Sequence, residues 1–146
     1  MKLSSESQYA LTGLLALAEL PEGAVRSVAG VAAATGASQP FLAKVFQRLA
    51  RGGVLVAHRG RAKGYALAAP PAEISLRMVV EAVEGPQLFR HCVFWSDACS
   101  DEHPCVLHEV WRGMAEQSVD LMERTSVADL RDRNAAAGRV LESLHL

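Results

Sequence analysis

The chain has 146 residues, a formal net charge of −1, half of its residues apolar and 21% charged. This length corresponds to one small domain or one domain with an appendage, and the composition excludes disordered and fibrous proteins. No apolar run reaches the roughly 18 residues of a membrane span, and the polar segment 1–8 lacks a signal-peptide pattern, so we expect a cytoplasmic protein without membrane contact.

The small net charge is the sum of two unlike halves. Residues 1–72 hold eight Lys/Arg and three acids, a balance of +5, whereas residues 73–146 hold seven Lys/Arg and thirteen acids, a balance of −6. No acid lies between Ala24 and Ala72. Such asymmetry indicates that the first half meets a polyanion, with a merely solvated basic face as the alternative.

The first half begins with three predicted helices. Apolar residues at helical spacing predict the first over 9–20. A second starts after Ser27 as N-cap and stops at Gly36, and a third starts after Ser38, with Pro40 in its first turn, and runs to 52. Two short helices joined by a glycine turn form a helix-turn-helix. The predicted core residues of the third helix are Phe41, Leu42, Val45, Phe46 and Leu49.

Two short strands follow, over 54–57 and 65–67, joined by a loop that carries three cations. A helix-turn-helix followed by a hairpin is a winged helix. A recognition helix places short polar side chains against base edges and cations against phosphates, and a basic hairpin tip suits a narrow minor groove. A solvated basic surface is the alternative for both elements. The residues predicted to contact double-stranded DNA are Ser38, Gln39, Pro40, Lys44, Arg48, His58, Arg59, Arg61 and Lys63.

The second half is predicted to be helical around one irregular segment, 87–103. Ser75 caps a helix that runs through Met78, Val79, Ala82 and Val83 and ends at Gly85. A long helix opens at Pro104 and ends near Thr125. A short turn follows Ser126, and residues 134–146 form a last helix. The apolar stripe predicted for the long helix consists of Leu107, Val110, Trp111, Met114, Leu121 and Met122.

These elements predict a mainly α fold with a small β-hairpin, in two parts. Residues 1–72 form a winged helix-turn-helix domain, and residues 73–146 form a metal-binding loop and a dimerisation helix. A long amphipathic helix outside a compact winged-helix core most often pairs with its twin, so we expect a homodimer. Packing of this helix back on its own domain is the alternative.

Three cysteines, Cys92, Cys99 and Cys105, fall within 14 residues. Their odd number and the lack of an export signal argue against a disulfide framework. Their spacings, x6 and x5, match neither a zinc knuckle nor a C-x-x-C redox pair. Widely spaced thiolates in a loop can surround an iron–sulfur cluster.

A histidine follows the last cysteine by three residues. We expect Cys105 and His108 in the first turn of the long helix, on one face, where the helix dipole favours thiolates. His108 is therefore a candidate fourth ligand, with a surface or capping residue as the alternative. His91 and His103 are further candidates because they flank the outer cysteines.

Several segments in a fixed order carry a family resemblance. They are 1–4 with Tyr9-Ala10-Leu11, Ser38 to Leu42, Arg59-Gly60 with Gly64-Tyr65-Ala66-Leu67, Ile74-Ser75-Leu76 with Val83-Glu84-Gly85, the three cysteines with Val110-Trp111, and Thr125 to Leu130. Over about residues 1–130 the chain resembles the Rrf2-type family of bacterial winged-helix regulators. The resemblance implies a homodimeric repressor that binds a roughly palindromic operator and senses redox state, iron–sulfur status or nitric oxide through a cluster on the three cysteines.

The resemblance also bears on the cluster type. His108 matches the fourth-ligand position of the branch that holds a [2Fe-2S] cluster. Branches with [4Fe-4S] can use an acidic ligand near the N-terminus, where this chain has Gln8. The first cysteine spacing is x6 where the [2Fe-2S] branch has x5, so [2Fe-2S] is favoured and [4Fe-4S] stays open. Lys63 replaces the first glycine of a Gly-Gly pair in the wing and adds a cation there.

Other functions remain possible from the residues alone. The thiols could form a zinc site or a bare redox switch, and the winged helix could be a protein-interaction module without DNA. An enzyme is not expected, because the sequence has no G-x-S-x-G, no P-loop and no H-E-x-x-H.

Overall fold

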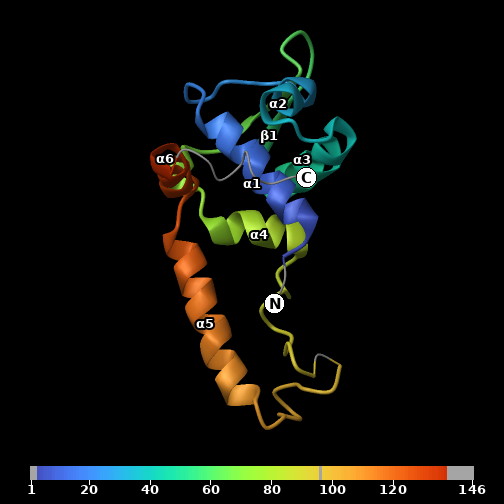
Figure 1. Ribbon diagram of the computed structural model, residues 1–146. Helices are drawn as coiled ribbons and strands as arrows, with labels where there is room; N and C mark the ends of the chain where they lie inside the picture. Colours follow the sequence, from blue (N-terminus) through green and yellow to red (C-terminus); the bar gives the residue numbers. More distant parts are fainter. Residues whose placement is uncertain (1–2, 96, 138–146) are drawn as a thin grey trace.

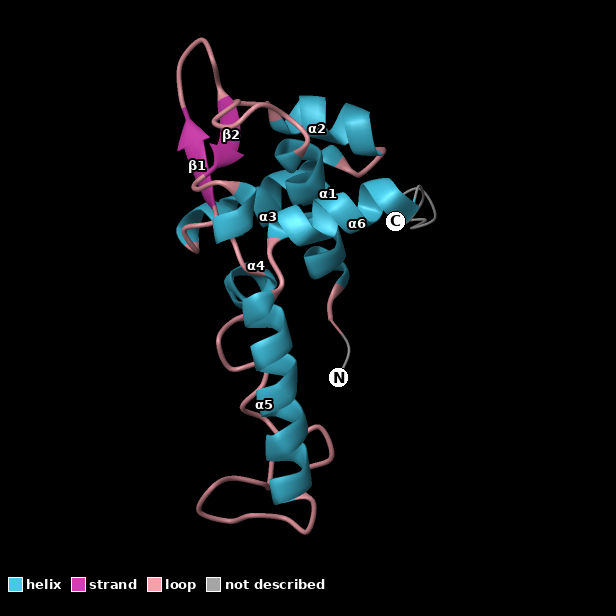
Figure 2. Ribbon diagram, turned by 90° about the vertical axis from the view of Figure 1, so that its left-hand side faces the viewer, coloured by secondary structure: helices cyan, strands magenta, loops and turns pink. Residues whose placement is uncertain are grey.

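The computed structural model describes residues 3–95 and 97–137, and it confirms a mainly helical fold with one hairpin (Figure 1). In both views the hairpin tip and the loop that holds the cysteines lie at opposite ends of the molecule (Figures 1 and 2). The described elements are α1 (Ser5–Ala18), α2 (Val28–Thr35), α3 (Gln39–Arg51), β1 (Leu55–His58), β2 (Gly64–Leu67), the 3-10 turn η1 (Pro71–Glu73), α4 (Leu76–Glu84), α5 (His108–Arg124) and α6 (Val127–Ala137).

Local capping signals set the helix-turn-helix. The side chain of Ser27 accepts a hydrogen bond from the Gly30 N–H at 3.0 Å, which starts α2 as predicted. Gly36 ends α2 with φ of +73°, a left-handed conformation that glycine adopts without strain. Ser38 is the N-cap residue of α3, and Pro40 lies in its first turn. These predicted boundaries are confirmed to within a residue.

The hairpin is fastened to the segment before α2. Its strands are antiparallel, with Leu55 opposite Leu67, and each is shifted from its prediction by one residue at one or both ends. Arg26 and Tyr65 exchange two backbone hydrogen bonds of 2.9 Å, which adds a bridge at the edge of the hairpin. A Cβ on Gly64 would lie 2.3 Å from the Arg26 carbonyl oxygen, so this close approach requires glycine.

Helix α1 lies at the centre of the main core. It packs against α2, α3, α4, α6 and β2. A Cβ on Gly13 of α1 would lie 2.5 Å from the ring of Phe46 in α3, so the two helices meet closely at this point. The buried residues of this core are Tyr9, Ala10, Leu14, Leu15, Leu17, Ala18, Val31, Ala37, Leu42, Val45, Phe46, Leu49, Val54, Leu55, Ile74, Val79, Val83 and Val127.

One predicted core residue is exposed instead. Phe41 of α3 is 39% exposed, because it lies at the edge of the helix face that meets α1, where its ring stacks on Tyr9 with centroids 4.9 Å apart. Met78 of α4 is also exposed, whereas its neighbours Val79 and Val83 are buried. Helical spacing gives the centre of a buried face more reliably than its edges.

The second half of the chain supplies elements to the same core. Ser75 caps α4 by accepting the Met78 N–H at 3.2 Å, as predicted. The short turn predicted after Ser126 is wrong: a helix, α6, begins there, because Ser126 and Asp129 cap each other's backbone N–H groups at 3.0 and 2.8 Å. Of the last helix predicted over 134–146, residues 134–137 end α6 and 138–146 lie outside the described residues.

Helix α5 leaves the main body and runs beside the cysteine loop, with α4 as its principal neighbour (Figures 1 and 2). It begins at His108, not at Pro104 as predicted, so Cys105 lies before the helix. Trp111 of its apolar stripe is buried. Val110, Met114 and Leu121 are exposed.

Two carboxylates hold the N-terminal end of α1. Glu84, the last residue of α4, accepts hydrogen bonds from the Ser4 N–H at 2.8 Å and from the hydroxyls of Ser4 and Ser7 at 2.5 and 2.6 Å. Partial burial opposes ionisation of Glu84, but these hydrogen bonds together hold the pKa of its carboxyl below the ordinary value. Glu6 of α1 pairs with Lys44 and Arg48 of α3.

We predict that Gly13→Ala lowers the free energy of unfolding by about 1–3 kcal/mol, because the new methyl group must displace the Phe46 ring. Chemical denaturation measures the change. Gly113→Ala is the matched control, since Gly113 also lies inside a helix but has open space around its Cβ position. The control should be neutral or stabilising by up to about 1 kcal/mol, and equal losses in both variants would contradict the packing argument.

We predict that Glu84→Gln lowers the free energy of unfolding at neutral pH and that its difference from wild type shrinks as the pH falls. A carboxyl with a depressed folded-state pKa stabilises the fold above its unfolded pKa and loses this effect as the pH falls through the folded pKa. Denaturant unfolding from neutral pH to below about pH 4 checks this. Glu19→Gln, at an exposed position, is the control, and a pH-independent difference would contradict the prediction.

Candidate metal centre and nucleic-acid interface

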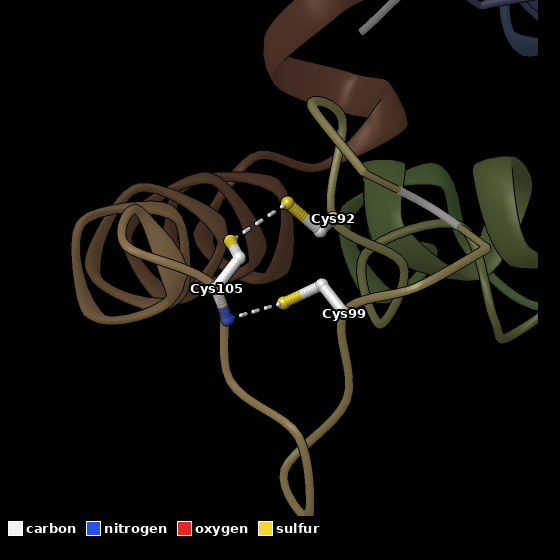
Figure 3. Close-up of side chains that lie close together, drawn as sticks. All are labelled: Cys92, Cys99 and Cys105. Atoms are coloured by element: carbon white, nitrogen blue, oxygen red, sulfur yellow. Dashed lines mark hydrogen bonds between the residues drawn. The ribbon is translucent and has the colours of Figure 1, made fainter.

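The three cysteines converge at one point in the loop between α4 and α5 (Figure 3). Their sulfur atoms all lie within 4.8 Å of one another, and those of Cys92 and Cys105 are 4.0 Å apart. A turn at 100–103, in which the Ser100 N–H donates to the His103 carbonyl at 3.2 Å, folds Cys105 back toward Cys99. The Cys105 N–H then donates to the Cys99 sulfur at 3.5 Å.

His108 joins this group from the first turn of α5. It is buried, and its Nδ1 lies 3.2 Å from the Cys99 sulfur, while its Nε2 lies 3.2 Å from a carboxylate oxygen of Asp101. Asp101 therefore pairs with the Nε2 atom of His108, and the Nδ1 atom is left facing the thiols. Sequence reasoning missed Asp101, which carries no motif and is recognisable only once the turn is folded.

The prediction that His108 approaches the cysteines by sharing a helical face with Cys105 is wrong. Because α5 begins at His108, Cys105 and His108 do not share a helical face, and the contact of His108 is with Cys99. Cys105 instead accepts the His108 N–H on its carbonyl at 3.1 Å. His91 and His103 are both exposed, and His91 lines the pocket beside the cysteines.

The thiols differ in acidity. The Trp95 N–H, followed by that of Phe94, donates to the sulfur of Cys92 and holds the pKa of this thiol below its usual value against the effect of burial. Burial raises the pKa of the Cys105 thiol, and the neighbouring sulfurs add to the rise. Cys92 is therefore the first of these two to become a thiolate.

The donor set suits a soft metal centre. Three thiolates and one imidazole match the ligands of zinc and of iron–sulfur clusters. Zn–S bonds of about 2.3 Å in a tetrahedron put sulfurs about 3.8 Å apart, close to the observed separation of Cys92 and Cys105. The described residues thus include three thiols close enough to share a metal ion.

An open pocket of about 610 Å³ adjoins the cysteines, and a small second core lies against it. This core consists of Cys92, Trp111 and Ala115, with Phe89, Cys99 and Cys105 packed against it. Trp111 is 6% exposed, and its indole Nε1 has no hydrogen-bond acceptor among the described residues. The pocket wall combines these groups with charged side chains, among them Arg90, Asp97 and Arg112.

The third helix presents a polar face opposite its buried one. Ser38, Gln39 and Pro40 are exposed at its start, as the DNA-contact prediction requires. Gln47 and Arg51 are exposed too, and helical spacing places them on the same face as Pro40. Sequence reasoning did not include Gln47 and Arg51 among the contacts, although the pattern of buried residues would have identified them.

Lys44 and Arg48 are not free cations in this fold. Lys44 is 60% exposed and pairs with Glu6 at 3.2 Å. Arg48 pairs with Glu6 and also donates to the Val83 carbonyl at 3.3 Å, so its guanidinium lies between α1 and the end of α4. Lys44 stays accessible to a ligand of α3, whereas the guanidinium of Arg48, whose side chain is 38% exposed, is occupied by two internal contacts.

The hairpin tip is the most accessible basic surface. His58, Arg59, Arg61 and Lys63 are all exposed there, and in the described part of the chain no carboxylate lies within ion-pair distance of them. Figure 2 shows the hairpin projecting beyond the helices. These cations can meet a polyanion without first breaking an internal contact. No helix among the described residues has the length and apolarity that crossing a membrane requires.

Comparison with solved structures shows the fold. CymR of B. subtilis superposes with a TM-score of 0.74 at 24% identity, covering 91% of this chain and 98% of that one. IscR of T. potens superposes with a TM-score of 0.67 at 22% identity, covering 96% and 93%.

Comparison of sequences shows the family. The HTH-type transcriptional regulator IscR of Aliivibrio salmonicida is 30% identical over 131 residues, 89% of this chain and 77% of the relative. IscR of Pectobacterium atrosepticum is 27% identical over an alignment that covers all of this chain and 98% of the relative. The family sequence profile described as Rrf2, iron-dependent transcriptional regulator, matches residues 3–133. The chain is therefore a member of the Rrf2 family of transcriptional regulators, which bind DNA and are not enzymes.

Proposed function

We propose that this protein is a homodimeric repressor that reads a DNA operator with its winged helix and senses through an iron–sulfur cluster. Cys92, Cys99 and Cys105 hold the cluster, and His108 is the fourth ligand. The convergence of three thiols and one imidazole in a single loop of an Rrf2-family chain carries the proposal. When bound, the cluster is the sensing group: its redox state changes with oxidants, its presence depends on the iron–sulfur supply, and it reacts with nitric oxide.

The ligand sphere favours [2Fe-2S], with [4Fe-4S] as the other possibility. Asp101 accepts from Nε2 of His108 and so keeps the lone pair of Nδ1 directed at the cysteines. Cys92 accepts two backbone N–H groups, which stabilises its thiolate form. The chain's own residues thus prepare one thiolate and orient one imidazole nitrogen for binding.

The DNA side uses α3 and the hairpin tip. Ser38, Gln39 and Pro40 face the major groove. Lys44 contacts a DNA phosphate after its ion pair with Glu6 breaks. The exposed Gln47 and Arg51 extend this surface. Arg48 acts chiefly as an internal link. The hairpin cations His58, Arg59, Arg61 and Lys63 engage the adjacent minor groove or its phosphates.

Dimerisation uses the exposed face of α5. Val110, Met114 and Leu121 are each more than half exposed on a helix whose buried side packs against α4 and the cysteine loop. Exposed apolar side chains at helical spacing favour a second helix as partner. Two copies joined in this way present two recognition helices to a two-fold operator.

A zinc site is the second candidate. The 4.0 Å separation of the Cys92 and Cys105 sulfurs is close to that expected across one tetrahedral metal ion. Anaerobic purification followed by a visible absorption spectrum with iron and sulfide quantitation separates the two functions. Charge-transfer bands with equal iron and sulfide support the cluster, and a colourless zinc protein overturns it.

We predict that Arg59→Ala weakens binding to duplex DNA by about 1–3 kcal/mol and lowers the slope of log affinity against log salt by about one. The reason is the loss of an exposed cation that has no internal partner among the described residues. Fluorescence anisotropy with a labelled duplex of random sequence measures both quantities.

The matched control is Arg133→Ala, which removes an exposed cation of α6 outside the winged helix. Arg133→Ala should leave affinity and salt slope unchanged. Unchanged affinity in Arg59→Ala would remove the hairpin from the DNA interface.

We predict that Cys99→Ala gives a folded but colourless protein, because Cys99 is the cysteine that contacts both Cys105 and His108. Iron and sulfide assays measure the loss, and circular dichroism checks the fold. His103→Ala, at an exposed position in the same loop, is the control and should keep its iron. His108→Ala should change the spectrum; a brown Cys99→Ala protein would sink the ligand assignment.

A further inference from the structure

The indole N–H of Trp111 is a buried donor without an acceptor. Trp111 is 6% exposed, and its Nε1 has no partner among the described residues, sulfur atoms included. Buried polar groups in folded proteins are nearly always hydrogen-bonded, so an exception at a candidate site calls for an explanation. An acceptor that binds at this place would supply one.

The surroundings of Trp111 limit what that acceptor can be. Trp111 lies in one buried cluster with Cys92, and Cys99 and Cys105 pack against this cluster. It follows His108 by three residues on α5, which places both side chains on one face of the helix. It also lines the pocket that Cys92, Cys99 and His108 share. In the buried cluster around Trp111, the groups that could accept its N–H and that lie nearest in the packing are the sulfurs of the candidate metal ligands, whereas the polar residues of the pocket wall, such as Ser100 and Glu116, line its open side.

We infer that the Trp111 indole N–H donates a hydrogen bond to a sulfur atom of the bound cluster and thereby raises its reduction potential. This inference rests on the proposed iron–sulfur function. Hydrogen bonds to cluster sulfurs are a known means by which a protein tunes the potential. Reduction adds negative charge to the sulfurs, so an N–H donor stabilises the reduced state more than the oxidised one. Trp111 is a positioning residue, since it is not itself a ligand.

Trp95 provides a matched comparison. It lies in the same loop as the cysteines, but its side chain is 48% exposed and can hydrogen-bond to water. Trp111→Phe and Trp95→Phe remove the same indole N–H group from a buried and an exposed place, and Trp95→Phe keeps the backbone N–H of residue 95 that donates to the Cys92 sulfur. Both variants leave Cys92, Cys99, Cys105 and His108 unchanged.

The experiment uses wild type, Trp111→Phe and Trp95→Phe, each prepared anaerobically as the full chain. Iron and sulfide content and the visible spectrum are measured first, because they test the proposed cluster. The midpoint potential is then measured by dye-mediated titration. We expect Trp111→Phe to retain iron and sulfide with a lower midpoint potential, and Trp95→Phe to match wild type. An unshifted potential in loaded Trp111→Phe overturns the inference.

If the Trp111→Phe protein fails to fold or to bind the cluster, a second measurement tests the inference without that variant. Wild type and Trp95→Phe, labelled with ¹⁵N in the indole ring, are reduced and examined by pulsed electron paramagnetic resonance. We expect coupling of the cluster spin to an exchangeable indole proton and its ¹⁵N in both proteins. A protein that contains the cluster but lacks this coupling overturns the inference about Trp111 and leaves the proposed cluster standing. Wild type that binds no iron and sulfide overturns the proposed cluster as well.

Discussion

The packing of α1 is the constraint on which the rest of this structure depends. This helix contacts α2, α3, α4, α6 and β2, and its buried residues occur around most of its circumference. At Gly13 the approach of α3 is so close that a methyl group would meet the Phe46 ring. The recognition helix, the hairpin and α4, which precedes the cysteine loop, are all positioned against α1, and α5 is positioned in turn against α4.

The polar end of α1 connects the two functional ends of the molecule. Glu84, just before the cysteine loop, holds Ser4 and Ser7, and Glu6 holds Lys44 and Arg48 on the recognition helix. The ion pairs of Glu6 also change where the accessible positive charge of residues 1–72 lies. Glu6 offsets part of the basic excess of residues 1–72, so the accessible positive charge is concentrated on the hairpin tip. A count of charges along the sequence cannot show this, because Glu6 and Arg48 are 42 residues apart.

Features set by neighbouring residues were predictable, and features set by distant contacts were not. Caps at Ser27 and Ser75 and the glycine stop at Gly36 depend on the next few residues. Phe41 has the spacing of a core residue, but its exposure depends on where α1 ends its contact with α3. The start of α5 was predicted too early, because the segment before His108 is held by a contact inside the cysteine loop and not by helical hydrogen bonds. In this contact the Cys105 N–H donates to the Cys99 sulfur. Ser126 was predicted as a cap, and its mutual capping with Asp129 is local, but the sequence pattern did not show that the capped segment continues as the helix α6.

The same distinction applies to the candidate metal centre. The clustering of cysteines in sequence indicated a site, but only the folded turn shows that Asp101 faces His108 and that Trp111 lies among the thiols. Three thiols within 4.8 Å cannot all ionise without a cation, since each thiolate opposes the next. Backbone N–H donors lower the pKa of Cys92, burial raises the pKa of Cys105, and the neighbouring sulfurs add to the rise at Cys105. A metal centre removes the competition among the thiols by displacing the remaining protons, so its affinity must rise with pH over the range in which Cys105 still carries one.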